Sequence, residues 1–311
     1  MQWLRPSPCK LKIQKLDLYD PHRGHRQVPI KVYLPQIEGS GKLPTVIWSH
    51  GLGGSRDGAA FLARHIAEQG FIVINVTHRG TDTTLWEGKP GHPWDAIRAT
   101  HISRRTTLHR FRDIPFVLNE VQRLQQGGEE LFQRVDFDRL GMSGHSFGAA
   151  TTQVMAGQML GKGKRRYSLK DPRFKAGIAY SMGAIYNGRE APEDIYSAIS
   201  LPMLYMTGTD DSSPTNGKDY TDRLPIFEHA SGPDQHLLVL EDGDHMVFAG
   251  SRGGLKENPK REEHETIIKD VALAFWHAYL NDDQAARTWL HSDAVTNYLG
   301  SEAEWKTRNL A

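Results

Sequence analysis

The stretch RLGMSGHSFGAA, residues 139–150, contains a Gly-x-Ser-x-Gly frame with Ser146 at its centre. The residues before this serine predict a buried strand over 137–144, and those after it predict a helix over 147–160. A serine on a sharp strand-to-helix turn is held with its hydroxyl in the crevice above a sheet, and the flanking glycines let helix and strand approach closely. Because such a frame also arises by chance, the surrounding sequence has to decide whether Ser146 is a nucleophile.

Alternating and apolar segments predict a strand pattern typical of an α/β protein. The segments 11–19 and 28–35 alternate in hydropathy and predict an antiparallel N-terminal pair. Short apolar runs elsewhere predict strands buried on both faces, separated by segments with helical periodicity. The expected buried strands are 45–50, 71–78, 137–144, 175–182, 201–208 and 236–243, and the expected helices are 59–70, Asp113 (as N-cap) to Gly127, 147–160 and 262–280.

This order predicts one α/β domain over residues 1–311, with a mostly parallel central sheet and helices on both faces. Residues 79–106 lack clear periodicity and are long for a connection, so we expect an active-site loop insertion there. The C-terminal stretch 287–311 predicts short helices packed on the body. In a parallel sheet of this kind, ligands bind beyond the carboxyl ends of the strands.

The bulk composition narrows the function. The chain has 38% hydrophobic and 24% charged residues and a formal net charge of +1, so no global field indicates nucleic acid or an anionic membrane as a partner. Cys9 is the only cysteine, which excludes an intrachain disulfide and a cysteine-based zinc site. No apolar run approaches the ~18 residues of a membrane span. The first residues lack the apolar core of a signal peptide, and the localisation stays open.

Candidate partners for Ser146 follow later strands. A serine hydroxyl needs a base, and the base is usually oriented by a carboxylate; in this architecture the chain order is serine, acid, histidine. His245 comes directly after the expected strand 236–243 and is the candidate base. Asp210 and Asp211 both follow the expected strand 201–208; the spacing after Gly208 favours Asp211, and Asp210 remains open.

An oxyanion hole and a substrate pocket are expected around these residues. One backbone donor would be Phe147, at the positive end of its helix, and the other Leu52, in the glycine-rich loop after strand 45–50. That loop lacks the lysine and the glycine spacing of a phosphate-binding loop. We expect Trp86, Trp94 and Met182 to wall the substrate pocket, although the two tryptophans would serve equally as packing anchors. Neither a metal nor a cofactor is expected.

The segments SHGLGGSRDGAAFLARHIAEQGFIVINVTHRG (49–80) and GHSFGAATTQ (144–153) resemble the α/β-hydrolase superfamily. Within it the chain is similar to the branch that holds platelet-activating-factor acetylhydrolases, dienelactone-hydrolase-like proteins and bacterial polyester hydrolases. The resemblance implies the α/β-hydrolase fold, with Ser146 as nucleophile, His245 as base and the amides of Leu52 and Phe147 as oxyanion donors.

Two departures from that branch refine the prediction. The acetylhydrolases carry their acid at the end of the strand that matches 175–182, where this chain has Tyr180 and Ser181 and no carboxylate. The acid is therefore expected after the next strand, as in the polyester and dienelactone types, which supports Asp211. Dienelactone hydrolases use a cysteine nucleophile, and Cys9 is far from the serine frame.

The resulting hypothesis is a serine-dependent carboxylic-ester hydrolase that works through an acyl-enzyme on a small-molecule or polymeric ester. A peptidase or acyltransferase with the same triad is one alternative. A non-catalytic binding protein on the same fold is the other. The natural ester, its acyl length and the oligomeric state are left open.

Overall fold

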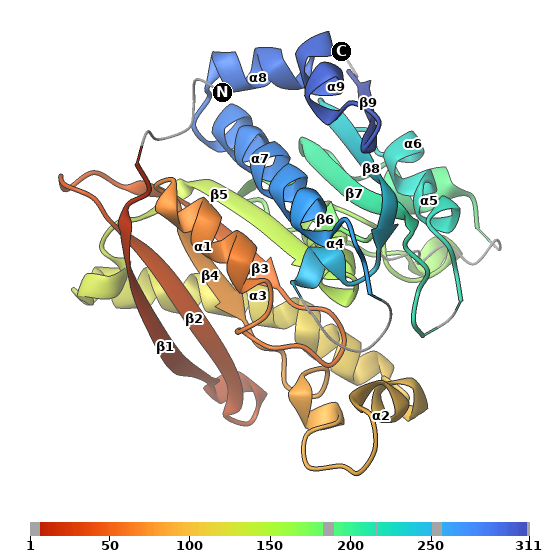
Figure 1. Cartoon of the computed structure of the whole chain (residues 1–311). Helices are drawn as coiled ribbons and strands as arrows, with labels where there is room; N and C mark the ends of the chain where they lie inside the picture. Colours follow the sequence, from red (N-terminus) through yellow and green to blue (C-terminus); the bar gives the residue numbers. More distant parts are fainter. Residues whose placement is uncertain (1–6, 183–189, 216, 251–256, 310–311) are drawn as a thin grey trace.

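The computed structural model describes residues 7–182, 190–215, 217–250 and 257–309, which form a nine-stranded sheet flanked by helices (Figure 1). The strands lie in the order β1-β2-β4-β3-β5-β6-β7-β8-β9. Their bounds are β1 (Lys10–Asp20), β2 (Arg26–Gln36), β3 (Leu43–Ser49), β4 (Ile72–Val76), β5 (Val135–His145), β6 (Phe174–Tyr180), β7 (Met203–Asp210), β8 (Gln235–Asp244) and β9 (Ala303–Arg308).

The pairing of the strands confirms the predicted fold class. β1 and β2 form the antiparallel N-terminal pair, and β2 also runs antiparallel to β4. From β4 through β3, β5, β6 and β7 to β8, all neighbours are parallel. Every residue of β3 and β4 is buried, as expected for central strands covered on both faces. The carboxyl ends of the parallel strands therefore meet at one edge of the sheet.

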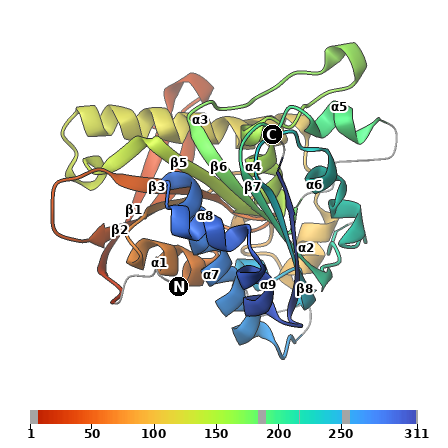
Figure 2. The same ribbon diagram turned by 90° about the horizontal axis from the view of Figure 1, so that it is seen from above.

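Helices cover both faces of this sheet. Figure 2 shows α1 and α7 on one face and α3 on the other. The first face packs a cluster that contains the buried Trp276 of α7, and α4 packs against β5 and β6. The helix bounds are α1 (Ala60–Glu68), α2 (Pro93–Ala99), α3 (Arg104–Gln126), α4 (Phe147–Ala156), α5 (Pro192–Tyr196), α6 (Pro225–His229), α7 (Arg261–Leu280), α8 (Gln284–Leu290) and α9 (Asp293–Leu299).

The start of α3 differs from the prediction. The helix begins at Arg104, and Ser103 is its N-cap, whose hydroxyl accepts a hydrogen bond from the Thr106 N–H at 3.1 Å. Asp113, predicted as the N-cap, lies inside the helix with its carboxylate fully buried. Pro115 also lies inside α3. Because proline is tolerated in the first turn of a helix and disfavoured in its interior, the sequence alone favours a start near Pro115, whereas the helix starts three turns earlier. The segment 79–106 accordingly contains α2 and the first residues of α3.

The C-terminal segment also holds an element that the sequence does not predict. Short helices alone are expected over residues 287–311, and α8 and α9 fit that expectation. β9 follows them and pairs antiparallel with β8, from Ala303 opposite Leu240 to Arg308 opposite Gln235. Most of its side chains are polar and half are exposed, so the strand lacks the apolar signal that marks the buried strands.

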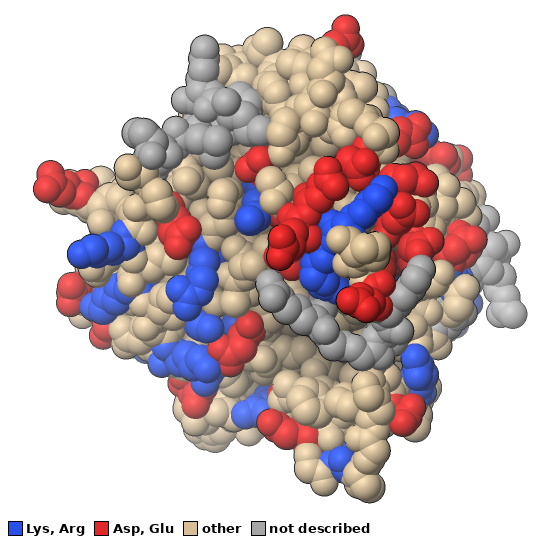
Figure 3. Space-filling view, in the orientation of Figure 1, with Lys and Arg blue, Asp and Glu red and all other residues tan. Residues whose placement is uncertain are grey.

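The surface carries both signs of charge. Figure 3 shows lysine and arginine side chains lying among aspartate and glutamate side chains on the face in view. This distribution fits the near-neutral net charge of the sequence. Within the described ranges, no helix is long and apolar enough to cross a bilayer.

Candidate active site

Ser146 sits on the turn between β5 and α4 in a rare backbone conformation. Its φ is 55° and its ψ is −112°, and its N–H donates a hydrogen bond to the carbonyl of Tyr180 at 2.9 Å. A non-glycine residue in such a conformation costs on the order of 1–3 kcal/mol and persists only where the surroundings enforce it. The turn directs the hydroxyl of Ser146 toward the carboxyl-end edge of the sheet.

The glycines of the frame are required by close backbone packing. A Cβ atom on Gly148 would lie 1.8 Å from the carbonyl oxygen of Ser49 in β3. A Cβ atom on Gly144 would lie 2.5 Å from the carbonyl carbon of Gly148. Both distances are far below van der Waals contact, so any side chain at these positions would force α4 and β3 away from β5.

Three side chains from three strand ends form a continuous hydrogen-bonded chain. The Oγ atom of Ser146 lies 3.1 Å from Nε2 of His245, which directly follows β8. Nδ1 of His245 lies 2.7 Å from Oδ1 of Asp211, which directly follows β7. Asp211 is fully buried, whereas Asp210 is exposed at the end of β7. Of the two aspartates left open by the sequence, Asp211 is the one that contacts the histidine.

Asp211 is held as an anion by its neighbours. Its Oδ2 accepts a hydrogen bond from Thr207 at 2.9 Å, and its Oδ1 accepts from Ser181 and from Nη2 of Arg223, each at 3.0 Å. Burial raises the pKa of the carboxyl, but the charge and hydrogen bond of His245, the charge of Arg223 and the hydrogen bond from Ser181 outweigh this effect and bring the pKa down to about 2. The carboxylate is thus charged at neutral pH and able to orient the imidazole.

Sequence reasoning assigns no role to His145 or Arg223, and it expects the strand end around Ser181 to wall the substrate pocket rather than to contact the histidine. Ser181, directly after β6, places its hydroxyl 2.8 Å from Nδ1 of His245. His145 donates from Nε2 to the backbone carbonyl of His245 at 2.8 Å, and burial lowers its pKa to about 3, which keeps it neutral. Ser181 and His145 carry a signal, since both lie at the ends of predicted strands. Arg223 lies in a connection without a motif.

A cavity of about 630 Å³ opens beside Ser146 and His245. Leu52 and Phe147, the expected oxyanion donors, both line it. So do Trp86 and Trp94, from the segment 79–106. Met182, in contrast, is fully buried in a separate core cluster and is not among the residues that line this cavity. The expectation that Met182 walls the pocket therefore does not match the structure.

The loop that carries Leu52 is fixed by bonds on both sides. The Gly53 N–H donates to the carbonyl of Thr81 at 2.8 Å, and the Gly54 N–H donates to the carbonyl of Gly51 at 3.1 Å. Nε1 of Trp86 donates to the carbonyl of Gly53 at 2.7 Å. Trp86 is therefore a cavity wall and also a support of the glycine-rich loop.

The described residues hold no cluster of three or more histidine, cysteine, aspartate or glutamate side chains placed to bind a metal ion. The site consists of a serine and a histidine that line a largely apolar cavity, with a buried carboxylate behind the histidine. Such an arrangement activates a hydroxyl by proton transfer to the imidazole.

Comparisons with known proteins show which proteins this chain resembles. The model of the family "Platelet-activating factor acetylhydrolase, isoform II" matches residues 14–87. A platelet-activating factor acetylhydrolase of Canis lupus familiaris is 26% identical over 238 residues, covering 67% of this chain and 48% of that protein. The Cavia porcellus protein of the same name is 23% identical over 301 residues, covering 86% and 64%. The chain thus spans about half to two thirds of the length of these relatives.

Among solved structures, a ferulic acid esterase from Streptomyces cinnamoneus superimposes with a TM-score of 0.62 at 19% identity, covering 90% of this chain and 92% of that one. The chain has the α/β-hydrolase fold, and its resemblance to that superfamily, with similarity to platelet-activating factor acetylhydrolases, is confirmed.

Proposed function

We propose that this protein is a serine-dependent carboxylic-ester hydrolase. The observation that carries the proposal is the chain of hydrogen bonds from Ser146 through His245 to Asp211 at the wall of an open cavity. In this proposal Ser146 is the nucleophile, His245 the general base and acid, and Asp211 the residue that orients the imidazole.

The acylation half begins with proton transfer. Nε2 of His245 takes the proton of Ser146 while Oγ attacks the ester carbonyl carbon, and the carbonyl oxygen becomes an oxyanion. The backbone N–H groups of Leu52 and Phe147 stabilise this charge, and the latter adds the positive end of α4. The protonated His245 then gives its proton to the leaving alcohol, and the carbon–oxygen bond to that alcohol breaks.

Deacylation repeats these steps with water. His245 takes a proton from a water molecule, which attacks the acyl-enzyme carbonyl, and returns the proton to Ser146 as the acid product leaves. The buried Asp211 carboxylate stabilises the imidazolium in both halves. The same anion fixes the tautomer in which Nε2 is free to accept a proton.

The cavity supports an apolar substrate group. Its volume of about 630 Å³ falls within the ~300–1,000 Å³ that is usual for sites of small organic ligands. Trp86 and Trp94 supply large apolar surfaces for an acyl or aryl group. The names of similar proteins suggest two test substrates, platelet-activating factor and a ferulate ester.

Two alternatives use the same residues. A peptidase or an acyltransferase would pass through the same acyl-enzyme and differ in the leaving group or the acceptor. A binding protein would keep the fold without turnover. The complete hydrogen-bonded chain at Ser146 favours catalysis over binding alone.

The first test is hydrolysis of p-nitrophenyl esters from acetate to decanoate, together with platelet-activating factor, methyl ferulate and a peptide p-nitroanilide. Wild type and Ser146→Ala are compared, each also treated with a fluorophosphonate probe, and circular dichroism confirms that both are folded. Ester turnover and labelling that vanish in the variant support the proposal. A folded wild type that neither turns over an ester nor takes the label would overturn it, and cleavage of the anilide alone would favour the peptidase.

A further inference from the structure

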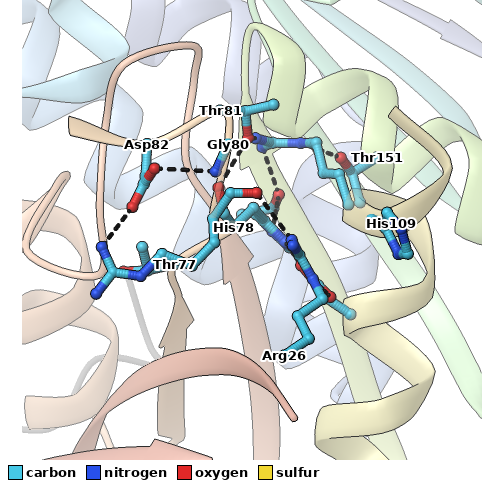
Figure 4. Close-up of polar contacts among 12 residues, drawn as sticks. Arg26, Thr77, His78, Gly80, Thr81, Asp82, His109 and Thr151 are labelled. Carbon is cyan, nitrogen blue, oxygen red and sulfur yellow. Dashed lines mark hydrogen bonds and ion pairs between the residues drawn. The ribbon is translucent and has the colours of Figure 1, made fainter. Parts of the chain in front are cut away.

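Arg110 is a fully buried arginine in the second turn of α3. Figure 4 shows its neighbourhood, with His78, Thr81 and Thr151 labelled. Its Nη1 donates to the Thr81 hydroxyl at 2.8 Å, and its Nε donates to the Thr151 hydroxyl at 2.9 Å. Its Nη2 donates to the Ser49 hydroxyl at 2.9 Å and also to the carbonyl of His50. In the described part of the chain, these direct partners are all neutral.

A buried guanidinium without a carboxylate in contact is costly. Removing a cation from water carries a desolvation penalty of several kcal/mol, which an adjacent anion usually offsets. Burial lowers the pKa of Arg110 to about 9, and the more distant Asp113 and Asp82 raise it only in part. A separate ion-pair network lies one turn further along α3, where Asp113 binds Arg23 and Arg26. Stability alone therefore does not explain why an arginine occupies this position.

The partners of Arg110 converge on the two halves of the proposed oxyanion hole. The first half is the loop after β3. The His50 carbonyl that Arg110 binds belongs to the peptide that joins His50 to Gly51, one residue before the proposed donor Leu52. The backbone of Thr81, whose side chain Arg110 also binds, accepts the Gly53 N–H on the other side of Leu52.

The second half is the start of α4. The guanidinium carbon of Arg110 lies 4.5 Å from the ring centroid of Phe147, the other proposed donor, in a cation–π contact. Thr151, bound by Nε of Arg110, lies one helical turn later and donates its hydroxyl to the Phe147 carbonyl at 3.0 Å. A single planar group thus contacts two segments that are about a hundred residues apart in the sequence.

We propose that Arg110 is a positioning residue that sets the separation and orientation of the Leu52 and Phe147 amides, so that the oxyanion hole is formed before substrate binds. This inference rests on the proposed function and goes beyond it. The planar guanidinium of arginine suits this task because it donates hydrogen bonds in several fixed directions. A lysine ammonium is a point charge on a flexible side chain and does not reproduce this geometry. Arg110 lies behind the hole and acts through the two backbone segments.

The test compares an ester with its thiono ester, in which sulfur replaces the carbonyl oxygen. Sulfur accepts hydrogen bonds weakly, so the ratio of kcat/KM for the oxo and thiono substrates reports on the oxyanion hole. Loss of one oxyanion donor costs about 10²–10³ in kcat, and a misplaced pair should approach that loss. For Arg110→Lys we expect kcat to fall ~10- to 100-fold, KM to stay within ~3-fold, and the oxo/thiono ratio to fall by ~10-fold.

The matched control is Arg26→Gln. Arg26 belongs to the ion-pair network around the buried Asp113, of which Arg110 is not a member. It makes two hydrogen bonds to Asp113 at 2.8 Å and one to the Arg79 carbonyl at 2.9 Å, and none of its own bonds goes to the loop after β3 or to α4. We expect the substitution to lower thermal stability and to leave the oxo/thiono ratio at the wild-type value. A fall in the ratio that appears equally in Arg26→Gln would assign the effect to general loosening of the fold and overturn the inference.

A milder variant covers the case in which Arg110→Lys does not fold. Thr151→Val is nearly isosteric and removes the partner of Nε; we expect a several-fold fall in kcat and in the oxo/thiono ratio. An active wild type whose ratio is unchanged in the folded variants would overturn the role of Arg110 and leave the esterase proposal standing. A wild type inactive on both esters would overturn the proposed function and this inference with it.

Discussion

The hydroxyl of Ser181 contacts both the Nδ1 atom of His245, at 2.8 Å, and the Oδ1 atom of Asp211, at 3.0 Å. The end of β6 therefore meets the ends of β7 and β8 at the proposed catalytic pair. Ser181 has a φ of 50°, which turns the chain as it leaves β6. The resemblance to the acetylhydrolases puts their acid at this strand end, while the carboxylate of this chain follows the neighbouring strand.

Ser181→Ala should weaken catalysis without abolishing it. The substitution removes a hydrogen bond to the charged Asp211, and such bonds contribute about 1.5–3 kcal/mol. We expect kcat to fall roughly 10-fold, with KM little changed, measured on a p-nitrophenyl ester. Ser143→Ala is the matched control, because Ser143 is also buried near the site but donates to the Ile47 carbonyl instead. Equal losses in both variants would argue against a specific role for Ser181.

The acid should be transferable from one strand end to the other. Asp211→Asn is expected to lower kcat by about 10⁴, as for a lost triad carboxylate, while Asp210→Asn stays near wild type. Adding Ser181→Asp to Asp211→Asn places a carboxylate at residue 181, the other residue that contacts Nδ1 of His245. We expect kcat of this double variant to be at least about 10-fold higher than that of Asp211→Asn alone, because a carboxylate again orients the imidazole. Thermal melting of the double variant confirms folding. No recovery in a folded double variant would contradict the geometric argument.

Gly148→Ala should disrupt the fold around the serine turn. The new Cβ would lie 1.8 Å from the Ser49 carbonyl oxygen, so β3 and α4 would have to separate. We expect a loss of at least about 3 kcal/mol in the free energy of unfolding, measured with urea, because forced overpacking typically costs about 1–3 kcal/mol and occasionally more. Gly41→Ala is the control, since its Cβ would meet nothing within 4 Å. A Gly148→Ala protein of wild-type stability would refute the packing argument.

Stability should decline as the pH falls from neutral. Burial lowers the pKa of His145 to about 3 and that of His78 to about 4, so both are neutral in the folded protein. In the unfolded chain they titrate near the ordinary histidine pKa of about 6.5, so the unfolded state binds more protons below that pH. The stability they contribute is complete above pH ~6.5 and is lost as the pH falls toward the folded-state values.

Urea unfolding at pH 7, 6, 5 and 4 measures this decline. A pKa that differs by one between the folded and unfolded protein corresponds to about 1.4 kcal/mol, so one such histidine accounts for roughly 3 kcal/mol between pH 7 and pH 4. In His145→Gln the difference in unfolding free energy between the two pH values should shrink by about that amount. An unchanged difference would show that His145 is not the neutral buried group that its surroundings indicate.

The arrangement of strands can be predicted because its signals are local. Buried strands such as β3 and β4 have the form of short apolar runs, and their alternation with helices implies parallel pairing. Once the strands are parallel, their ends share one edge. Residues 146, 211 and 245 are therefore expected near one another although they are far apart in the sequence, and the structure brings them into contact.

The parts that the sequence does not predict depend on long-range contacts between polar groups. An exposed helix cap is the natural interpretation of Asp113, because a charged residue is rarely buried unless it is paired. Its partners Arg23 and Arg26 lie about 90 residues away, on the turn and strand after β1, and no local pattern links them. The same holds for Arg110, whose contacts lie in separate segments. The position of Met182 after a strand says nothing about the direction of its side chain.

The short strand β9 gives the chain a vulnerable period during biosynthesis. β8 is finished at Asp244, but its outer edge is covered only when residues 303–308, about sixty residues later, have been made and have paired with it. Until then an apolar strand with unpaired backbone groups is open to other nascent chains. Heterologous production at a lower temperature, or with holdase chaperones that shield this edge, should therefore raise the yield of folded protein more than substitutions in the finished core.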